Sequence, residues 1–192
     1  MERRVPGVLH SLVIQLDIFD AIRQRKSVRS YAPTLVSEEV LVRILGATRL
    51  APSAVNFQPW HFVVVEDQGK RTRIAGGCKY GKFIAESPVV IVGCGNKKVS
   101  PKWHVVDTTI ALEHLVLAAT ALELGTCWIG SFDKDDLREM LMLPQEYEIV
   151  ALIALGYPRE KTKTVAENLR VGRPRKKLEE IVSRETYGSK TR

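Results

Sequence analysis

Residues suited to holding an anion occur early in the chain, at Arg25, Ser27 and Arg29. Guanidinium groups supply forked donors that match the geometry of phosphate, and a serine hydroxyl adds another donor. Arg25 and Arg29 share a face if the segment is helical, and all three residues share a face if it is extended. By itself the segment is equally typical of a solvated basic helix end, where cations favour the helix dipole.

A second candidate stretch, residues 50–66, changes from loop to strand within a few positions. Pro52 lacks an amide hydrogen, and Ser53 and Asn56 favour turns. The apolar run 62–65 has no polar alternation, which predicts a strand buried on both faces. A polar loop held on a rigid strand is typical of a binding site, although a structural turn has the same pattern.

Motifs for metals and nucleotides are not evident. The cysteines Cys78, Cys94 and Cys127 are widely spaced and form no C-x-x-C pair, which predicts small buried side chains in a reducing compartment. The four histidines form no H-E-x-x-H, so no protein-bound metal is expected. The glycines of 93–95 begin a G-x-G, but Lys98 stands where a dinucleotide fingerprint needs its third glycine.

The hydrophobic pattern predicts the elements that must position these residues, in the order helix, helix, strand, helix, strand, long helix, strand, helix, strand. This order indicates an α/β or α+β layer arrangement. The long helix is apolar on most sides, which predicts burial within the domain or against another subunit, and Gly125 is predicted to end it. The helices are expected at 18–26, 38–47, 69–74, 105–124 and 134–141, and the strands at 61–66, 89–93, 126–129 and 147–155.

Length and composition fit one ordinary domain, because 192 residues with 45% hydrophobic content can bury a proper core. Residues 1–15 have no clear periodicity and are expected to be an N-terminal extension of a domain at 16–192. No apolar run is long enough to cross a bilayer, and the weak apolar stretch near the N-terminus lacks a cleavage site. A cytoplasmic protein that binds no membrane is therefore expected.

The net charge of +7 is unevenly distributed, because residues 159–192 hold 11 Lys and Arg against 5 Asp and Glu. Such a basic tail suits nucleic acid, a membrane, a phosphate group or only solvent. Against nucleic acid, the basic residues form no aromatic-interleaved or recognition-helix pattern, and Glu179 and Glu180 interrupt them.

Four pieces in this order resemble the FMN-dependent nitroreductase family. They are RKSVR at 25–29, APSAVNFQPW at 51–60, GTCWIG at 125–130 and RPR at 173–175. The resemblance covers roughly residues 17–182. It implies an α+β fold with a mixed sheet flanked by helices, in an intertwined homodimer with an FMN at each of two sites across the interface.

The resemblance also implies roles for the basic residues. Two groups would jointly hold the FMN phosphate, one near the first helix and one in the tail, which would account for the basic tail. Another cation would reach the pyrimidine edge of the flavin ring. By position, Arg25, Lys26 and Ser27 form the first phosphate group, Arg173 and Arg175 form the second, and Arg29 is the cation at the ring.

The remaining matches are implied to lie around the flavin ring. The loop residues would lie against the FMN of the partner subunit, and the end of the third strand would lie beside the ring with a backbone amide directed at flavin N5. A lysine is expected near the ring. These residues are Pro52, Ser53, Ala54 and Asn56 in the loop, Ile129 and Gly130 after the strand, and Lys82.

The implied function is an NAD(P)H-dependent nitroreductase or flavin oxidoreductase with a ping-pong cycle. NAD(P)H would give a hydride to flavin N5, and a nitroaromatic, quinone or flavin would then take the electrons. A reductive dehalogenase or flavin-fragmenting enzyme would need a substrate lid, and no such insertion is seen. Two further alternatives are a flavin carrier without turnover and a nucleic-acid-binding module.

Overall fold

A computed structural model describes residues 17–159 and 174–189. The chain divides into two compact units, residues 1–159 and 160–192. In the second unit the described residues form a single helical turn, η3 (Leu178–Glu180), whose Glu180 carboxylate accepts a hydrogen bond from the Lys177 amide at 2.8 Å. The expected extension at 1–15 lies outside the described residues, so the division into 1–15 and 16–192 stays a prediction.

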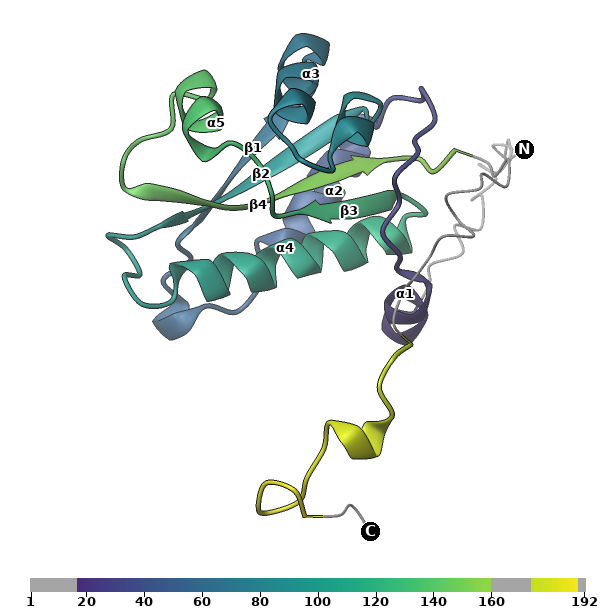
Figure 1. The fold of residues 1–192 in the computed structure, drawn as a ribbon, viewed down its shortest axis with the longest axis vertical. Coiled ribbons are helices and arrows are strands. Elements are labelled where there is room, and N and C mark those ends of the chain that lie inside the picture. The colour runs from purple at the N-terminus through teal and green to yellow at the C-terminus, as the bar shows by residue number, and fades with distance from the viewer. Residues whose placement is uncertain (1–16, 160–173, 190–192) are drawn as a thin grey trace, which may run out of the picture. The chain divides into compact units, whose positions relative to one another are not determined.

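The first unit is built on a four-stranded sheet in the order β1-β2-β4-β3 (Figure 1). All three strand pairings are antiparallel, whereas a mixed sheet was expected. In the described residues, parallel pairing is limited to an isolated bridge between Ser27 and Thr126. The strands are β1 (Trp60–Val65), β2 (Val89–Asn96), β3 (Gly125–Ile129) and β4 (Tyr147–Gly156).

The helices follow in the predicted order, which confirms the α+β class. Four of them begin at an acceptor side chain, Asp17, Ser37, Asp67 or Asp133, which satisfies a free amide of the first turn. No helix in the described ranges is long and apolar enough to cross a membrane. The helices are α1 (Ile18–Gln24), α2 (Glu38–Thr48), α3 (Gln68–Gly76), α4 (His104–Ala121) and α5 (Lys134–Met140), with short 3-10 turns η1 (Ala54–Asn56) and η2 (Lys82–Ala85).

Helices cover both faces of the sheet, with α3 and α5 on one face and α2 and α4 on the other (Figure 1). The alternation of side chains along β2 divides the core accordingly. Val90 and Val92 pack with Ile74 of α3, whereas Ile91 packs with Leu112 of α4. Both central strands are therefore buried on both faces, which explains their unbroken apolar sequences.

The strand after the candidate loop differs from the prediction of burial on both faces. β1 lies at the edge of the sheet, and its residues Phe62, Val63 and Val64 are only half-buried, whereas Val65 is buried. The apolar run was a correct signal for a strand but not for its place in the sheet. The number of neighbours that a strand has depends on the order of strands, which its own sequence does not contain.

The end of α4 also differs from the prediction that Gly125 terminates it. The helix ends at Ala121, and Glu123 takes the left-handed conformation with φ 62°. The Leu124 amide donates to the Ala119 carbonyl at 2.9 Å and the Glu123 amide to the Thr120 carbonyl at 3.0 Å, which is the hydrogen-bond pattern of a Schellman motif. Gly125 is instead the first residue of β3.

Glycines in β2 allow α4 to approach the sheet closely, which gives the G-x-G sequence a structural role. A Cβ at Gly93 would lie 2.6 Å from Leu112 Cδ1. A Cβ at Gly95 would lie 2.8 Å from the His104 carbonyl oxygen and 2.9 Å from Thr108 Oγ1. A backbone carbonyl cannot rotate away as a side chain can. A side chain at position 95 would therefore be tolerated less well than one at position 93.

We therefore expect Gly95→Ala to destabilise the fold by about 1–3 kcal/mol, because the helix must shift to admit the methyl group. Gly46→Ala in α2 is the matched control. No atom lies within 4 Å of a Cβ there, so the same change should stabilise the protein by about 0.5–1 kcal/mol. Urea unfolding of the two variants measures both effects, and a neutral Gly95→Ala would contradict the close approach.

Candidate functional site

The first candidate segment is extended where it meets the sheet. α1 ends at Gln24, and Arg25 has φ −52° and ψ 125°, so the predicted helix to residue 26 is two residues too long. Ser27 pairs with Thr126, and the Val28 amide donates to the Thr126 carbonyl at 2.8 Å. Of the two alternatives left open by the sequence, the extended one is correct at Ser27.

The same contacts bring the first and third motifs side by side. Gly125 permits this approach, because a Cβ there would lie 2.6 Å from a Val28 methyl carbon. Val28 packs against the core, whereas Arg29 next to it is exposed. The basic residues are thereby held along β3 while their charges face water.

Tyr31 anchors this segment to the sheet from the other side. Its ring is fully buried, and its hydroxyl donates to the Val28 carbonyl at 2.8 Å, with the Ala154 carbonyl a second acceptor at 3.3 Å. Burial raises the pKa of Tyr31 well above its ordinary value, so the hydroxyl stays a donor. The Ala32 amide also donates to the Tyr157 carbonyl at 2.9 Å, so the segment is fixed to the end of β4.

The cations of this segment have no counter-ion within the described parts of the chain. Arg25, Lys26 and Arg29 make no ion pair or side-chain hydrogen bond among those residues. Burial raises the pKa of the Cys127 thiol, and the nearby Arg29 and Ser27 lower that pKa in part. Three positive charges that have no partner among the described residues and follow one another along a strand can bind an anionic group such as phosphate.

The cationic segment contacts the start of β3, at Gly125 and Thr126, and the strand leads from there to an open end at Gly130. Ile129 is 7% exposed and belongs to the core, whereas Gly130 is exposed. No atom lies within 4 Å of the place where a Cβ of Gly130 would stand. The backbone at Gly130 can therefore be approached closely by a flat ligand.

The loop of residues 53–58 has an unusual backbone. Val55, Asn56 and Gln58 have φ angles of 50°, 57° and 49°, in the left-handed region that glycine favours. Each such residue costs about 1–2 kcal/mol relative to the right-handed form, and Val55 is β-branched and 86% exposed. The Gln58 amide donates to Ser53 Oγ at 2.9 Å and the Asn56 amide to the Ser53 carbonyl at 3.0 Å, which fixes the turn internally.

A buried carboxylate that the sequence analysis did not single out connects this loop to α4. Asp107 is 3% exposed, and its Oδ1 accepts a hydrogen bond from the Ala54 amide at 3.2 Å. The sequence holds one weak signal for it, an acidic residue in the first turn of an otherwise apolar helix. Such a residue is equally typical of a solvated first turn, so only the structure reveals its contact.

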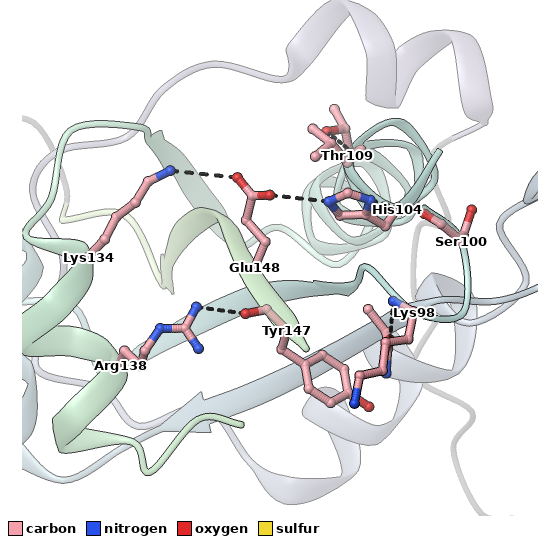
Figure 2. Close-up of polar contacts among 10 residues, drawn as sticks. Lys98, Ser100, His104, Thr109, Lys134, Arg138, Tyr147 and Glu148 are labelled. Atoms are coloured by element: carbon pink, nitrogen blue, oxygen red, sulfur yellow. Dashed lines mark hydrogen bonds and ion pairs between the residues drawn. The ribbon is translucent and has the colours of Figure 1, made fainter. Parts of the chain in front are cut away.

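The N-terminus of α4 holds a further polar network, in which Glu148 lies between Lys134 and His104 (Figure 2). His104 Nδ1 is 3.0 Å from the Ser100 carbonyl oxygen, and its Nε2 is 3.2 Å from Glu148 Oε2. Both ring nitrogens therefore lie within hydrogen-bond distance of an oxygen. The hydrogen bond from His104 lowers the pKa of Glu148 below its ordinary value of 4.5, and the charge of Lys134 lowers it further.

Because its folded-state pKa is lowered, Glu148 stabilises the fold above pH 4.5, and this contribution is lost as the pH falls through the folded-state value. We expect Glu148→Gln to reduce the free energy of unfolding near neutral pH and to have little effect in acid. Glu146→Gln is the control, because the Glu146 carboxylate makes no ion pair in the described residues. Parallel pH profiles of urea unfolding for wild type and Glu148→Gln would contradict this role.

The remaining predicted site residues are Lys82, Arg173 and Arg175. Lys82 is the exposed first residue of η2 and makes no ion pair in the described part of the chain. Arg173 lies outside the described residues. Arg175 is exposed in the second unit, so its expected role beside Arg25 stays a prediction.

The second motif lies far from the first within one chain. Ala54 contacts Asp107 near the start of α4, whereas Ser27 and Val28 contact β3 just beyond the end of α4. At 1.5 Å per residue, the 14 steps from Asp107 to Ala121 span about 21 Å. The loop also leads into β1 at the edge of the sheet opposite to β3.

The predicted burial of the cysteines is confirmed, because all three are free and buried. Burial raises the pKa of each thiol, that of Cys94 to about 11. Within the described residues no three His, Cys, Asp or Glu side chains gather in a way that could hold a metal ion.

Fold and site together define an α+β protein in which cations without a counter-ion among the described residues are held at the start of a strand whose other end is open. The profile of the Nitroreductase family matches residues 22–79 and 75–157. The chain belongs to this family, which confirms the resemblance on which the site residues were chosen.

Three relatives illustrate the match. A Methanothermobacter thermautotrophicus protein, provisionally named an NADH dehydrogenase/NAD(P)H nitroreductase, is 34% identical over 79% of this chain and 83% of its own length. The FMN reductase [NAD(P)H] of Bacillus subtilis is 25% identical over 89% of this chain and 74% of its length. The solved structure of an FMN-dependent nitroreductase from Clostridium difficile has a TM-score of 0.69 at 30% identity, over 77% of this chain and 92% of its own.

Proposed function

We propose that this nitroreductase-family chain is an FMN-dependent oxidoreductase that passes electrons from NAD(P)H to an electron-poor small molecule by a ping-pong cycle. The observation that carries the proposal is the cationic segment, Arg25, Lys26 and Arg29, which has no counter-ion among the described residues and is held at the start of β3, a strand whose far end at Gly130 is open. Both features suit FMN, which combines a phosphate with a flat ring. Relatives named FMN reductase [NAD(P)H] and FMN-dependent nitroreductase support this choice.

In this proposal the phosphate is held by Arg25, Lys26 and Ser27 together with Arg173 and Arg175 of the tail. Ser27 is fixed by its pairing with Thr126, so the backbone that carries its hydroxyl and the neighbouring cations is already in place before the ligand binds. Pre-oriented charged donors form strong hydrogen bonds to phosphate oxygens.

At the ring, FMN when bound supplies the redox chemistry, taking a hydride from NAD(P)H and passing the electrons to a nitroaromatic, quinone or flavin. The chain supplies position and charge. Arg29 places a cation where negative charge develops, and the amide of Gly130 orients the ring beside Ile129. Lys82 adds a second cation near the ring. No side-chain nucleophile is required.

The loop residues Pro52, Ser53, Ala54 and Asn56 are assigned to the second face of the ligand. Both backbone groups of Ala54 are paired within the chain, because its amide donates to Asp107 and its carbonyl accepts from Phe57. Its contact with FMN would therefore be apolar, through Cβ. The side-chain amide of Asn56 makes no hydrogen bond in the described residues and can reach the ligand.

The distance between the motifs supports a homodimer. The loop and the cationic segment are separated by most of α4 in one chain, so a second copy would bring its loop to the cations of the first. Large apolar side chains are exposed where such a copy could pack. On α1 they are Ile18, Phe19 and Ile22, at the start of α4 Trp103, Val105 and Val106, and near the loop Leu50, Val55 and Phe57.

The proposal includes a cytoplasmic location, because three buried free cysteines suit a reducing compartment. It includes neither a membrane nor a nucleic-acid partner, since the basic residues are assigned to the FMN phosphate. Residues 1–15 are proposed as an extension of a single domain at 16–192.

The test is the visible absorbance of the purified protein, followed by anaerobic titration with NADH and NADPH. We expect a flavin spectrum that bleaches with at least one of the two nucleotides and recovers when a quinone or nitroaromatic is added. A bound flavin that neither nucleotide bleaches would indicate a carrier and contradict turnover. A protein that takes up no FMN would contradict the whole proposal.

We expect the double variant Arg25→Ala/Arg173→Ala to lose FMN while it stays folded. Each charged hydrogen bond contributes about 1.5–3 kcal/mol, so the loss of two should weaken FMN binding by roughly two to four orders of magnitude. The matched control is Arg43→Ala/Arg49→Ala, which removes the same charge from exposed positions of α2 and its C-cap. Equal flavin content of the two variants after dialysis would remove the phosphate assignment.

A further inference from the structure

We infer that Asp107 is the positioning residue that holds the loop of residues 53–58 in the conformation that meets FMN. The inference rests on the proposed function, because the contact between loop and FMN is part of that proposal. Asp107 lies in none of the four motifs, and its action on the ligand passes through the Ala54 amide.

The loop needs such a residue because its backbone is unfavourable by itself. Val55, Asn56 and Gln58 all have left-handed φ angles that non-glycine residues rarely adopt. The hydrogen bonds among Ser53, Asn56 and Gln58 lie within the loop. They fix its internal shape and cannot fix its place on the protein.

Asp107 provides the connection to the body of the protein. The bond from the Ala54 amide to Asp107 Oδ1, 3.2 Å long, is the one hydrogen bond among the described residues that joins 53–58 to another helix or strand. A hydrogen bond to a charged acceptor is stronger than one between neutral groups, and burial shields this one from competing water.

The carboxylate is itself held in place. Its Oδ2 accepts a hydrogen bond from the Ser100 hydroxyl at 3.4 Å, and Ser100 is 1% exposed. The Ser100 carbonyl in turn accepts the His104 amide at 3.0 Å. Asp107 also lies in the first turn of α4, where the helix dipole favours a negative charge. The acceptor is thus fixed before the loop docks on it.

Without this acceptor the loop would populate its FMN-contacting conformation for only part of the time. The apparent dissociation constant of a ligand rises by the inverse of that fraction. Because the loop would lie against the FMN of a second copy, Asp107 of one subunit would set the affinity of the site shared with its partner.

The test uses the full chain and three variants. Asp107→Ser removes the acceptor with a residue suited to a first helical turn, Asp107→Asn retains an oxygen toward Ala54, and Ser100→Ala removes only the hydrogen bond to Oδ2. Two quantities are measured, the hydrogen-exchange rate of the Ala54 amide in FMN-free protein and the dissociation constant of FMN. Urea unfolding of each variant corrects the exchange rate for global stability.

We expect Asp107→Ser to raise both the exchange rate and the dissociation constant by about tenfold or more. Asp107→Asn should lose less than Asp107→Ser, because it keeps a weaker, neutral acceptor for Ala54, and Ser100→Ala should stay near wild type, because it keeps the carboxylate. Ala54→Pro removes the donor instead and should also weaken FMN binding by about tenfold. Ser53 already has the extended angles of a residue that precedes proline, φ −142° and ψ 159°.

Unchanged FMN affinity in both Asp107→Ser and Ala54→Pro would overturn the positioning role and leave the proposed function intact. Equal losses of FMN affinity in Asp107→Ser and Asp107→Asn would also overturn the positioning role. The charge of Asp107, and not its hydrogen bond to Ala54, would then determine the affinity. Failure of the wild type to bind FMN would overturn the proposed function itself, and that result is known before any variant is made.

Discussion

The close packing of α4 against the central strands is the constraint on which the other features of this protein depend. The helix reaches the sheet only because β2 has glycine at positions 93 and 95, where a Cβ would meet Leu112 and the His104 carbonyl. The start of α4 places Asp107 beside the candidate loop. The turn that ends α4 places Gly125 against Val28. Both halves of the candidate site are therefore set by one helix.

In this arrangement the cationic segment and the loop with the unfavourable backbone angles are two separate parts of the chain. The cationic segment is extended and well anchored, by Thr126 on one side and by the buried Tyr31 on the other. The loop of residues 53–58 has unfavourable backbone angles, and its Ala54 amide donates to one buried carboxylate, that of Asp107. The cationic segment and the loop therefore lie near opposite ends of α4, the longest helix of the described residues, and the proposed homodimer would combine them at one ligand.

Much of the architecture was predictable from local patterns. The Asp and Ser caps, the apolar runs of β2 and β4 and the order of elements all follow from interactions between residues close in the chain. The errors have a common cause. The edge position of β1, the antiparallel sheet and the ending of α4 at Ala121 depend on neighbours that are distant in sequence or on a single left-handed residue, Glu123.

The sequence by itself determined the family, the α+β class and the residue types offered to an FMN, because the four motifs are short and contiguous. Only the tertiary structure decided which alternative holds at Ser27, which motifs lie together and which carboxylate holds the loop. Asp107 and Ala54 are 53 residues apart, and nothing in the local pattern of either residue indicates the other. A hydrogen bond between such distant residues exists only after the sheet and α4 have packed.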